Sequence, residues 1–312
     1  MESILVTGGA GYIGSIMVPK LLSAGYKVMV LDNFRHQTNS LAHCCASQNF
    51  EIFKGDVRDE TLVKDCLKKC DIVIPLAALV GAPLCKREPE LARQTNHDAI
   101  ANMLQLMSNE QMLLMPTTNS GYGVAMDDEY CTEESPLNPI SEYGKDKVEI
   151  EKKILDRENS VSFRLATVFG MSPRMRVDLL VNDFVYRGIN DGYLVLFESH
   201  FRRNYIHISD VVEAFLQGIR KFDIMKGNAF NVGLSDANLT KLELAELVQK
   251  FIPHLTIIKA EVGEDPDKRD YLVSNEKIEK TGFKPQISLA DGIAELKKGY
   301  VYLNNLRYGN YG

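Results

Sequence analysis

A glycine-rich turn near the N-terminus restricts the fold of this chain more than any other segment. An apolar run over residues 3–7 leads directly into TGGAGYIG at 7–14, and residues 14–24 continue with apolar side chains at helical spacing. This order of strand, turn and helix offers unpaired backbone N–H groups and the positive end of a helix dipole. Small residues there let a diphosphate approach the backbone, so the segment predicts a dinucleotide site in an open α/β sheet.

An acidic residue closes the next predicted strand. Residues 27–31 read KVMVL and are followed by Asp32, about 20 residues beyond the turn, which is the usual spacing for a ribose-binding carboxylate. Such a carboxylate accepts hydrogen bonds from ribose hydroxyls and repels a 2′-phosphate, which favours NAD over NADP. Arg35 can pair with that phosphate, so NADP stays open at this point. The other role open to Asp32 is that of a turn or cap residue.

The order of apolar segments predicts the fold class. Short apolar runs alternate with amphipathic stretches in the first half, which is typical of a parallel sheet with crossover helices. The second half has more turn residues, but residues 203–219 and 230–232 look like a return to the sheet. We expect an α/β protein with a Rossmann-type doubly wound parallel sheet, formed by residues 1–170 and about 204–233. Residues 171–203 and 234–312 should form a smaller C-terminal α/β substrate lobe.

Composition and charge exclude several classes of protein. The chain has 312 residues, 45% hydrophobic, with a formal net charge of −6 and no basic block, which argues against general nucleic-acid binding. It contains no apolar run of about 20 residues and no signal peptide at Met1, so we expect no membrane partner and a cytoplasmic location. The six cysteines form no CxxC pair. We therefore expect free thiols and no metal site.

A tyrosine and a lysine form the candidate catalytic pair. Tyr143 and Lys147 lie four residues apart on the predicted helix 142–156, so they share one helix face. The ammonium group stabilises the phenolate, and the tyrosine can then take a proton from an alcohol while hydride leaves the carbon. A polar turn at 117–120 follows a predicted strand, and the hydroxyl of Thr118 or Thr117 can bond the reacting oxygen. The alternatives are a solvated helix face and local turn bonding.

Together these segments resemble the extended short-chain dehydrogenase/reductases, in particular the NAD-dependent sugar-nucleotide epimerase/dehydratase family. The resemblance covers nearly the whole chain. Its motifs are TGGAGYIGS at 7–15, LDN at 31–33, GDVRD at 55–59, LAA at 76–78, SEYGKDK at 141–147, RNYIH at 203–207 and KRDY at 268–271.

The resemblance implies roles for individual residues. The catalytic residues would be Tyr143, Lys147 and Thr118. The NAD-binding residues would be Gly8, Gly11, Tyr12, Ile13, Gly14, Asp32, Asn33, Asp56, Val57, Leu76, Ala77, Ala78, Asn96, Tyr143 and Lys147. The substrate-binding residues would be Thr118, Asn119, Ser120, Thr167, Arg174, Asn182, Arg203, Asp267 and Arg269. By the same analogy we expect a sugar-nucleotide substrate and a homodimer.

Several residues differ from those usual in this family, and the differences reduce the number of reactions that we expect. Pro75 stands where the family usually has histidine, and Thr167 where many members have asparagine. The 4,6-dehydratases continue their catalytic turn as Thr-Asp-Glu, whereas this chain has Thr118, Asn119 and Ser120. An amide and an unassisted hydroxyl are poor substitutes for an acid and a base, because neither titrates usefully near neutral pH. Net dehydration is therefore disfavoured.

We therefore expect oxidation of a sugar carbon, most simply carbon 4. The reaction either ends there, as a dehydrogenation, or returns hydride to the other face, as a 4-epimerisation. Residues 164–176 resemble enzymes of bacterial capsule and surface-polysaccharide synthesis, with GDP-heptose-oxidising dehydrogenases as the closest type. The non-enzymatic alternative is a dinucleotide-binding sensor.

Overall fold

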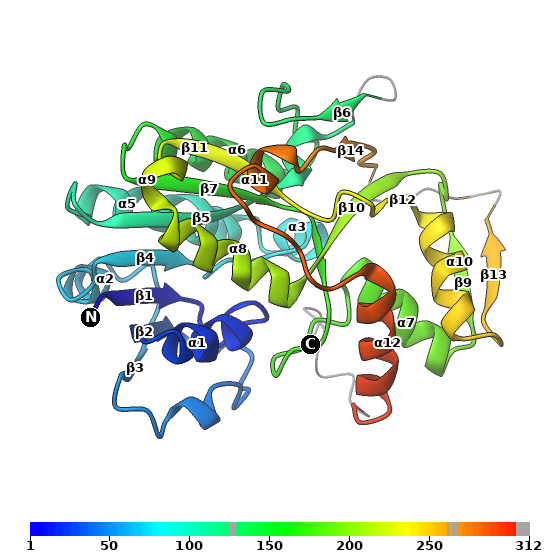
Figure 1. The fold of residues 1–312 in the computed structure, drawn as a ribbon, viewed down its shortest axis with the longest axis horizontal. Coiled ribbons are helices and arrows are strands. Elements are labelled where there is room, and N and C mark those ends of the chain that lie inside the picture. The colour runs from blue at the N-terminus through cyan, green and yellow to red at the C-terminus, as the bar shows by residue number, and fades with distance from the viewer. Residues whose placement is uncertain (125–128, 261–262, 264–267, 304–312) are drawn as a thin grey trace.

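A seven-stranded parallel sheet forms the centre of the protein. The computed structural model describes residues 1–124, 129–260, 263 and 268–303. The strand order is β11-β7-β5-β4-β1-β2-β3, with every neighbouring pair parallel (Figure 1). The strands are β1 (Ser3–Thr7), β2 (Lys27–Asp32), β3 (Phe50–Lys54), β4 (Ile72–Pro75), β5 (Met112–Thr118), β7 (Ser160–Leu165) and β11 (Asn228–Val232).

Helices cover both faces of this sheet. Ile4 and Val6 of β1 pack in one core with α1 (Gly14–Ser23) and α8 (Ile208–Arg220). Leu5, between them, packs in a second core with α2 (Glu60–Leu67), α5 (Ala99–Leu106) and α6 (Glu142–Leu155). Successive strand side chains point to opposite faces, so both faces of β1 are buried. The prediction of a doubly wound α/β fold is confirmed.

Apolar residues at helical spacing over residues 91–107 predict one long helix, but the structure has three parts there. Residues Pro89–Arg93 form α4, Gln94–Asp98 form the π-helical segment η2, and Ala99–Leu106 form α5. Before them lies α3 (Ala82–Arg87), and the short 3-10 helices are η1 (Ala42–Cys44) and η3 (Asn119–Tyr122). The π-helical widening places Thr95 and Asn96 beside the loop that follows β4.

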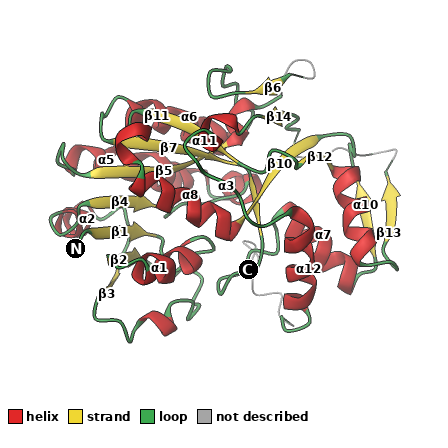
Figure 2. Ribbon diagram, in the orientation of Figure 1, coloured by secondary structure: helices red, strands yellow, loops and turns green. Residues whose placement is uncertain are grey.

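The second half adds three small sheets and more helices. A three-stranded sheet joins β12 (Asn238–Thr240), β10 (Arg202–His207) and β8 (Thr167–Phe169). Two-stranded sheets pair β9 (Tyr193–Leu196) with β13 (Thr256–Lys259), and β6 (Tyr130–Cys131) with β14 (Leu272–Val273). The helices are α7 (Leu180–Asn190), α9 (Phe222–Met225), α10 (Lys241–Phe251), α11 (Glu276–Glu279) and α12 (Leu289–Tyr300) (Figure 2).

Two details of the predicted sheet need correction. The apolar segment over residues 161–169 predicts one strand, but the chain leaves the main sheet at Ala166 and β8 pairs with β10 instead. Residues 203–207 therefore return to this smaller sheet, while β11 does return to the large one. In Figure 1, α7, α10, α12, β9 and β13 gather at one end of the molecule. We propose that these elements form the substrate lobe.

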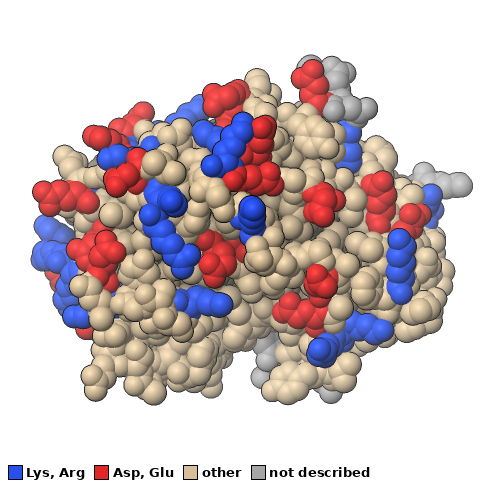
Figure 3. All heavy atoms as spheres, viewed as in Figure 1, with Lys and Arg blue, Asp and Glu red and all other residues tan. Residues whose placement is uncertain are grey.

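The surface carries both signs of charge. On the face shown in Figure 3, lysine and arginine side chains alternate with aspartate and glutamate, without a broad basic area. Among the described helices, none combines the length and the apolar character that a membrane crossing requires.

Candidate active site

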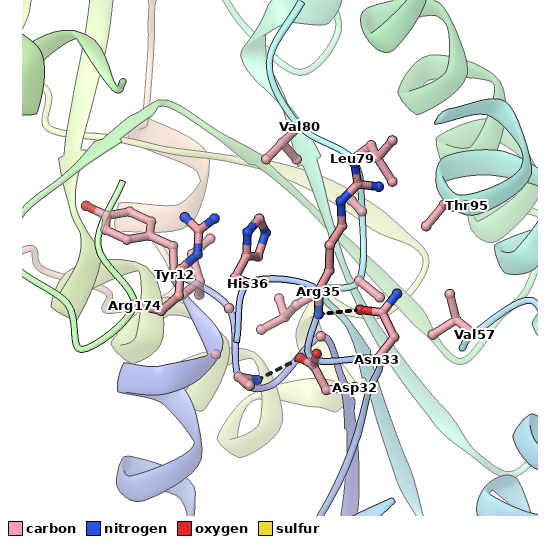
Figure 4. A pocket seen from close by; sticks show the side chains of 18 of the residues that line it. Tyr12, Asp32, Asn33, Arg35, His36, Val57, Leu79, Val80, Thr95 and Arg174 are labelled. Atoms are coloured by element: carbon pink, nitrogen blue, oxygen red, sulfur yellow. Dashed lines mark hydrogen bonds between the residues drawn. The ribbon is translucent and has the colours of Figure 1, made fainter. Parts of the chain in front are cut away.

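A groove runs along the carboxyl ends of β1, β2, β4 and β5, where the loops of a parallel sheet meet. The glycine-rich turn, the loop after β2, residues 55–58 and residues 76–80 line it, together with Tyr143 and Lys147 of α6. Of the fifteen predicted NAD-binding residues, all but Asn96 line this groove. Figure 4 shows its labelled side chains.

The glycines form a cradle that larger residues would fill. Gly8 has φ +68°, and a Cβ atom there would lie 2.6 Å from the backbone nitrogen of Ala77. A Cβ atom at Gly14 would lie 2.4 Å from the carbonyl oxygen of Gly9. The turn closes through a 3.0 Å bond from the Gly11 N–H to the Gly8 carbonyl. Because no side chain covers this turn, the backbone N–H groups at the start of α1 can approach the diphosphate of a dinucleotide.

Asp32 is held in place by backbone donors. Its Oδ2 accepts from the Ala10 N–H at 2.9 Å and its Oδ1 from the Phe34 N–H at 2.7 Å. Figure 4 shows Asp32 beside Asn33 and Arg35. Burial raises the pKa of this carboxyl, against the opposing effect of the two bonds. Each oxygen has a further lone pair for a ribose hydroxyl. The Arg35 guanidinium pairs with Glu88 at 2.7 Å, so it is engaged by a carboxylate beside the groove.

Asp56, which also lines the groove, is held ionised by a neighbouring arginine. Its oxygens accept from Arg58 Nε at 2.9 Å and Nη2 at 3.0 Å, and from Asn33 Nδ2 at 3.4 Å. The bond from Arg58 is the main cause that lowers the pKa of Asp56 to about 2. Arg58 also donates to Gln94 at 3.0 Å, which ties this loop to η2.

The structure corrects the prediction for Asn96. Its side chain is fully buried and does not line the groove. Its Oδ1 accepts from the Leu79 N–H, and its Nδ2 donates to the Leu79 carbonyl, both at 2.8 Å. Asn96 therefore fixes the loop that forms one wall of the groove, while its neighbour Thr95 lines it.

Tyr143 and Lys147 share one face of α6, as predicted. The helix begins after Ser141, whose Oγ accepts from the Gly144 N–H at 3.1 Å. Lys147 Nζ lies 6.0 Å from the centre of the Tyr143 ring and donates to the Pro116 carbonyl at 3.3 Å. Burial lowers the pKa of Lys147 to about 8. Burial raises the pKa of Tyr143 to about 12, while the charges of Arg176 and Arg269 act to lower it.

The two threonines at the end of β5 have different hydrogen-bond partners. Thr117 Oγ1 donates to Glu151 at 2.8 Å, in the interior behind the turn. Thr118 Oγ1 donates to Ser120 Oγ at 2.9 Å and accepts from the Ser120 N–H at 3.1 Å. Asn119 is 1% exposed, and neither its amide nitrogen nor its amide oxygen has a hydrogen-bond partner among the residues that the structure describes. The Thr117 hydroxyl is bonded to Glu151, whereas the Thr118 hydroxyl is not. Thr118 is therefore the better candidate to bond the reacting oxygen.

Two predicted substrate arginines lie beside this turn. The Arg269 guanidinium donates to the Ser120 hydroxyl, and the Arg203 guanidinium donates to the Arg269 carbonyl. The Arg203 guanidinium also lies 5.7 Å from the centre of the Tyr271 ring. Ser120, Arg203 and Arg269 therefore form one group. Asp267 lies outside the described residues.

Three other residues predicted to bind the substrate lie apart from this turn. Arg174 lines the cofactor groove, where it acts electrostatically on Asp32 and His36. Asn182 is fully buried on α7, where its Oδ1 accepts from the Gly170 N–H and its Nδ2 donates to the Tyr12 hydroxyl and the Arg176 carbonyl. Its amide is used by the protein, so it does not face a ligand. Thr167 begins β8, and its role as a substrate ligand stays a prediction.

Sequence reasoning missed several residues that line the groove, among them His36 and Arg58. His36 lies in the loop after Asp32, and burial, aided by the charges of Arg174 and Arg35, lowers its pKa to about 4. His36 is therefore neutral at pH 7. Neither residue has a distinctive spacing, although Arg58 lies within the GDVRD segment, which could have drawn attention to it.

Comparison with known proteins agrees with this geometry. The model of the NAD dependent epimerase/dehydratase family matches residues 4–233. UDP-glucuronic acid decarboxylase 1 of Arabidopsis thaliana is 30% identical over 307 residues, which cover 94% of this chain and 68% of that protein.

Solved structures share the fold over nearly the whole chain. dTDP-glucose 4,6-dehydratase from Bacillus anthracis, in complex with NAD, is 21% identical with a TM-score of 0.83, and the match covers 99% of both chains. UDP-glucuronic acid 4-epimerase from Bacillus cereus, in complex with UDP-glucuronic acid and NAD, is 21% identical with a TM-score of 0.83, covering 96% of this chain and 99% of that one. None of these three is a GDP-heptose enzyme, so they lend no support to that expectation. The chain belongs to the NAD-dependent epimerase/dehydratase family, whose members are enzymes of sugar-nucleotide chemistry.

Proposed function

We propose that this protein oxidises carbon 4 of a nucleotide-linked sugar, with NAD as the cofactor. The observation that carries the proposal is that Tyr143 and Lys147 line the same groove as the glycine-rich turn and Asp32. When bound, NAD supplies a hydride acceptor. The protein's part is to orient the sugar hydroxyl between Thr118 and Tyr143 and to remove its proton.

Tyr143 is the proposed base, and its surroundings determine whether it can act. A pKa of about 12 is too high for a base at neutral pH, so the phenolate needs nearby positive charge. Lys147, with a pKa of about 8, is mostly protonated at pH 7 and supplies that charge. Arg176 and Arg269 act in the same direction.

Arg203 and Arg269 are the proposed ligands of the substrate diphosphate. Both guanidinium groups lie near the turn that carries Ser120, and guanidinium groups form strong charge-assisted bonds with phosphate oxygens. We propose a homodimer as well, by analogy with the family. Sedimentation at several protein concentrations would test the dimer.

Asn119 and Ser120 support a product other than a 4,6-dehydrated sugar. Removal of the carbon 5 proton and loss of water from carbon 6 each need a group that titrates near neutral pH. Neither side chain does so unaided. The proposed outcomes are therefore a 4-keto sugar or its 4-epimer.

A second candidate outcome is decarboxylation of a sugar acid. A sugar oxidised at carbon 4 and carrying a carboxylate on carbon 5 is a β-keto acid. Its C–C bond to the carboxylate breaks with the electron pair passing toward the 4-keto oxygen, and the carbon is then protonated. The 30% identical relative is itself named for UDP-glucuronic acid decarboxylation.

Product analysis distinguishes these outcomes. The NAD-loaded protein would be incubated in deuterated water with UDP-glucuronic acid, UDP-glucose, dTDP-glucose and a GDP-linked heptose, with NADH absorbance and NMR spectra recorded. A 4-keto product with NADH, a 4-epimer without NADH, or a pentose with released CO2 each selects one outcome. A 6-deoxy product carrying solvent deuterium would contradict the argument from Asn119. No reaction with any sugar nucleotide would favour the dinucleotide-binding sensor.

A further inference from the structure

A buried pair of opposite charges lies directly behind the candidate catalytic turn. Glu151 of α6 and Arg164 of β7 are 3% and 5% exposed, and Arg164 Nη2 donates to Glu151 Oε1 at 2.7 Å. Glu151 follows Lys147 by four residues, as Lys147 follows Tyr143, so all three lie along one stripe of the helix. The proposed reaction uses the first two residues of the stripe and gives no role to the third.

Glu151 holds the beginning of the turn. Its Oε2 accepts from Thr117 Oγ1 at 2.8 Å and from Ser162 Oγ at 2.6 Å. Thr117 immediately precedes Thr118, so its position determines where the Thr118 hydroxyl lies relative to α6. The helix that carries Tyr143 is thereby bonded to the strand that carries Thr118.

Arg164 holds the other end of the same turn. Its Nη1 donates to the Tyr122 hydroxyl at 3.0 Å and to the Glu133 carbonyl at 3.0 Å. Tyr122 ends η3, and its hydroxyl donates in turn to Asn231 Oδ1 at 2.7 Å. Residues 118–121 are therefore fixed at both ends by one ion pair.

We infer that Glu151 and Arg164 are positioning residues, which hold the turn of Thr118, Asn119 and Ser120 in register with Tyr143. The catalytic part of this inference rests on the proposed function. A displacement of about 1 Å in a reacting group can cost about 100-fold in rate, so a change behind the turn should reach the chemistry. A pair that only stabilised the fold would affect melting temperature without this effect on rate.

Three variants separate the two roles. Glu151→Gln keeps the shape of the side chain and removes its charge. The double variant Glu151→Leu with Arg164→Met removes both charges, which commonly restores the stability lost by breaking a buried pair. Asp210→Asn is the matched control, because Asp210 is 2% exposed and accepts from the Gln286 and Ile287 N–H groups at 2.9 and 3.0 Å, outside the groove.

The catalytic readout is kcat compared with KM and NAD affinity. In Glu151→Gln we expect kcat to fall about 10- to 100-fold, with KM for the sugar nucleotide and Kd for NAD within about 3-fold of wild type. In the double variant the melting temperature should recover while kcat stays low. Asp210→Asn should lower the melting temperature and leave kcat unchanged. A kcat that recovers with stability in the double variant, or that falls equally in the control, would overturn the inference.

A second readout needs no turnover. Amide hydrogen exchange of the NAD-loaded protein should be faster over residues 117–123 in Glu151→Gln than in wild type, and unchanged there in Asp210→Asn. Unchanged exchange in Glu151→Gln overturns the positioning role even in an active enzyme. Faster exchange in a protein whose wild type oxidises no sugar nucleotide supports the positioning of the turn and refutes the proposed function.

Discussion

Tyr143 and Lys147 show how burial acts in opposite directions on an acid and a base. Burial disfavours the charged form of each, so it raises the pKa of the phenol to about 12 and lowers that of the ammonium group to about 8. Lys147, whose Nζ lies 6.0 Å from the centre of the Tyr143 ring, still carries its charge near neutral pH and can favour the phenolate. The pair therefore has to be considered as one unit.

Removal of the phenol hydroxyl tests the base directly. We expect Tyr143→Phe to lower the oxidation rate by about 10²- to 10⁴-fold, the usual range for positioned acid–base catalysis. NAD affinity should change little, because the glycine-rich turn and Asp32 are untouched. Stopped-flow measurement of NADH formation, beside fluorescence titration of NAD, separates these effects. Turnover of the Phe variant close to that of wild type would exclude Tyr143 as the base.

The lysine should impose an alkaline limit on activity. Because its pKa is lowered to about 8, its charge is present below that pH and is lost as the pH rises through it. We expect the rate to fall above about pH 8 in wild type. In Lys147→Arg the guanidinium stays charged, so whatever activity remains should not show this alkaline fall. A pH profile of kcat for both proteins is the measurement, and identical alkaline limbs would assign the titration to another group.

At the scale of elements, local sequence predicted the parts that depend on local spacing. The strands of the large sheet and the helices beside them follow from apolar runs and helical periodicity, and they place the glycine-rich turn and α6 correctly. The departure of β8 from the main sheet, its pairing with β10, and the burial of Asn182 against Tyr12 depend on contacts between distant residues. Spacing along the chain carries no information about such contacts, so it could not place Arg174 on the cofactor side of the site.

The turn between β1 and α1 should tolerate no side chain at its first glycine. In Gly8→Ala the Cβ atom would lie 2.6 Å from the Ala77 nitrogen, in a backbone conformation at φ +68° that side chains also disfavour. We expect a loss of at least about 2 kcal/mol in unfolding free energy and a loss of NAD binding. Gly192→Ala is the control, because its φ is +76° with no atom within 4 Å of the added carbon. Equal losses in urea denaturation would show that backbone strain, without the clash, decides the effect.

At the scale of the whole molecule, the glycine-rich turn also holds the second half of the chain. The Tyr12 hydroxyl donates to the Gly170 carbonyl at 2.7 Å and accepts from Asn182 Nδ2 at 3.1 Å. Ser172 Oγ donates to the Tyr12 carbonyl at 2.8 Å. The loop that delivers Arg174 and Arg176 to the groove is therefore bonded to the cofactor turn itself.

Loss of the Tyr12 hydroxyl should loosen this connection. Tyr12→Phe leaves the Gly170 carbonyl and the Asn182 amide without this partner, which should cost about 1–3 kcal/mol of unfolding free energy. We also expect weaker NAD binding, because Arg174 and Arg176 depend on the same loop. Calorimetry with and without NAD measures both effects. A variant as stable as wild type would show that water replaces the hydroxyl.

The ion pair between Arg35 and Glu88 has a consequence for how long the cofactor stays bound. It joins the loop after β2 to the junction of α3 and α4, and Figure 4 shows the Arg35 side chain extending from the Asp32 loop toward Leu79. Its two side chains are 41% and 30% exposed, so dissolved salt screens their attraction. Exchange of bound NAD for labelled NAD should therefore speed up as ionic strength rises, and this dependence should disappear in Glu88→Gln. An enzyme that retains NAD at low ionic strength would then release it at high ionic strength.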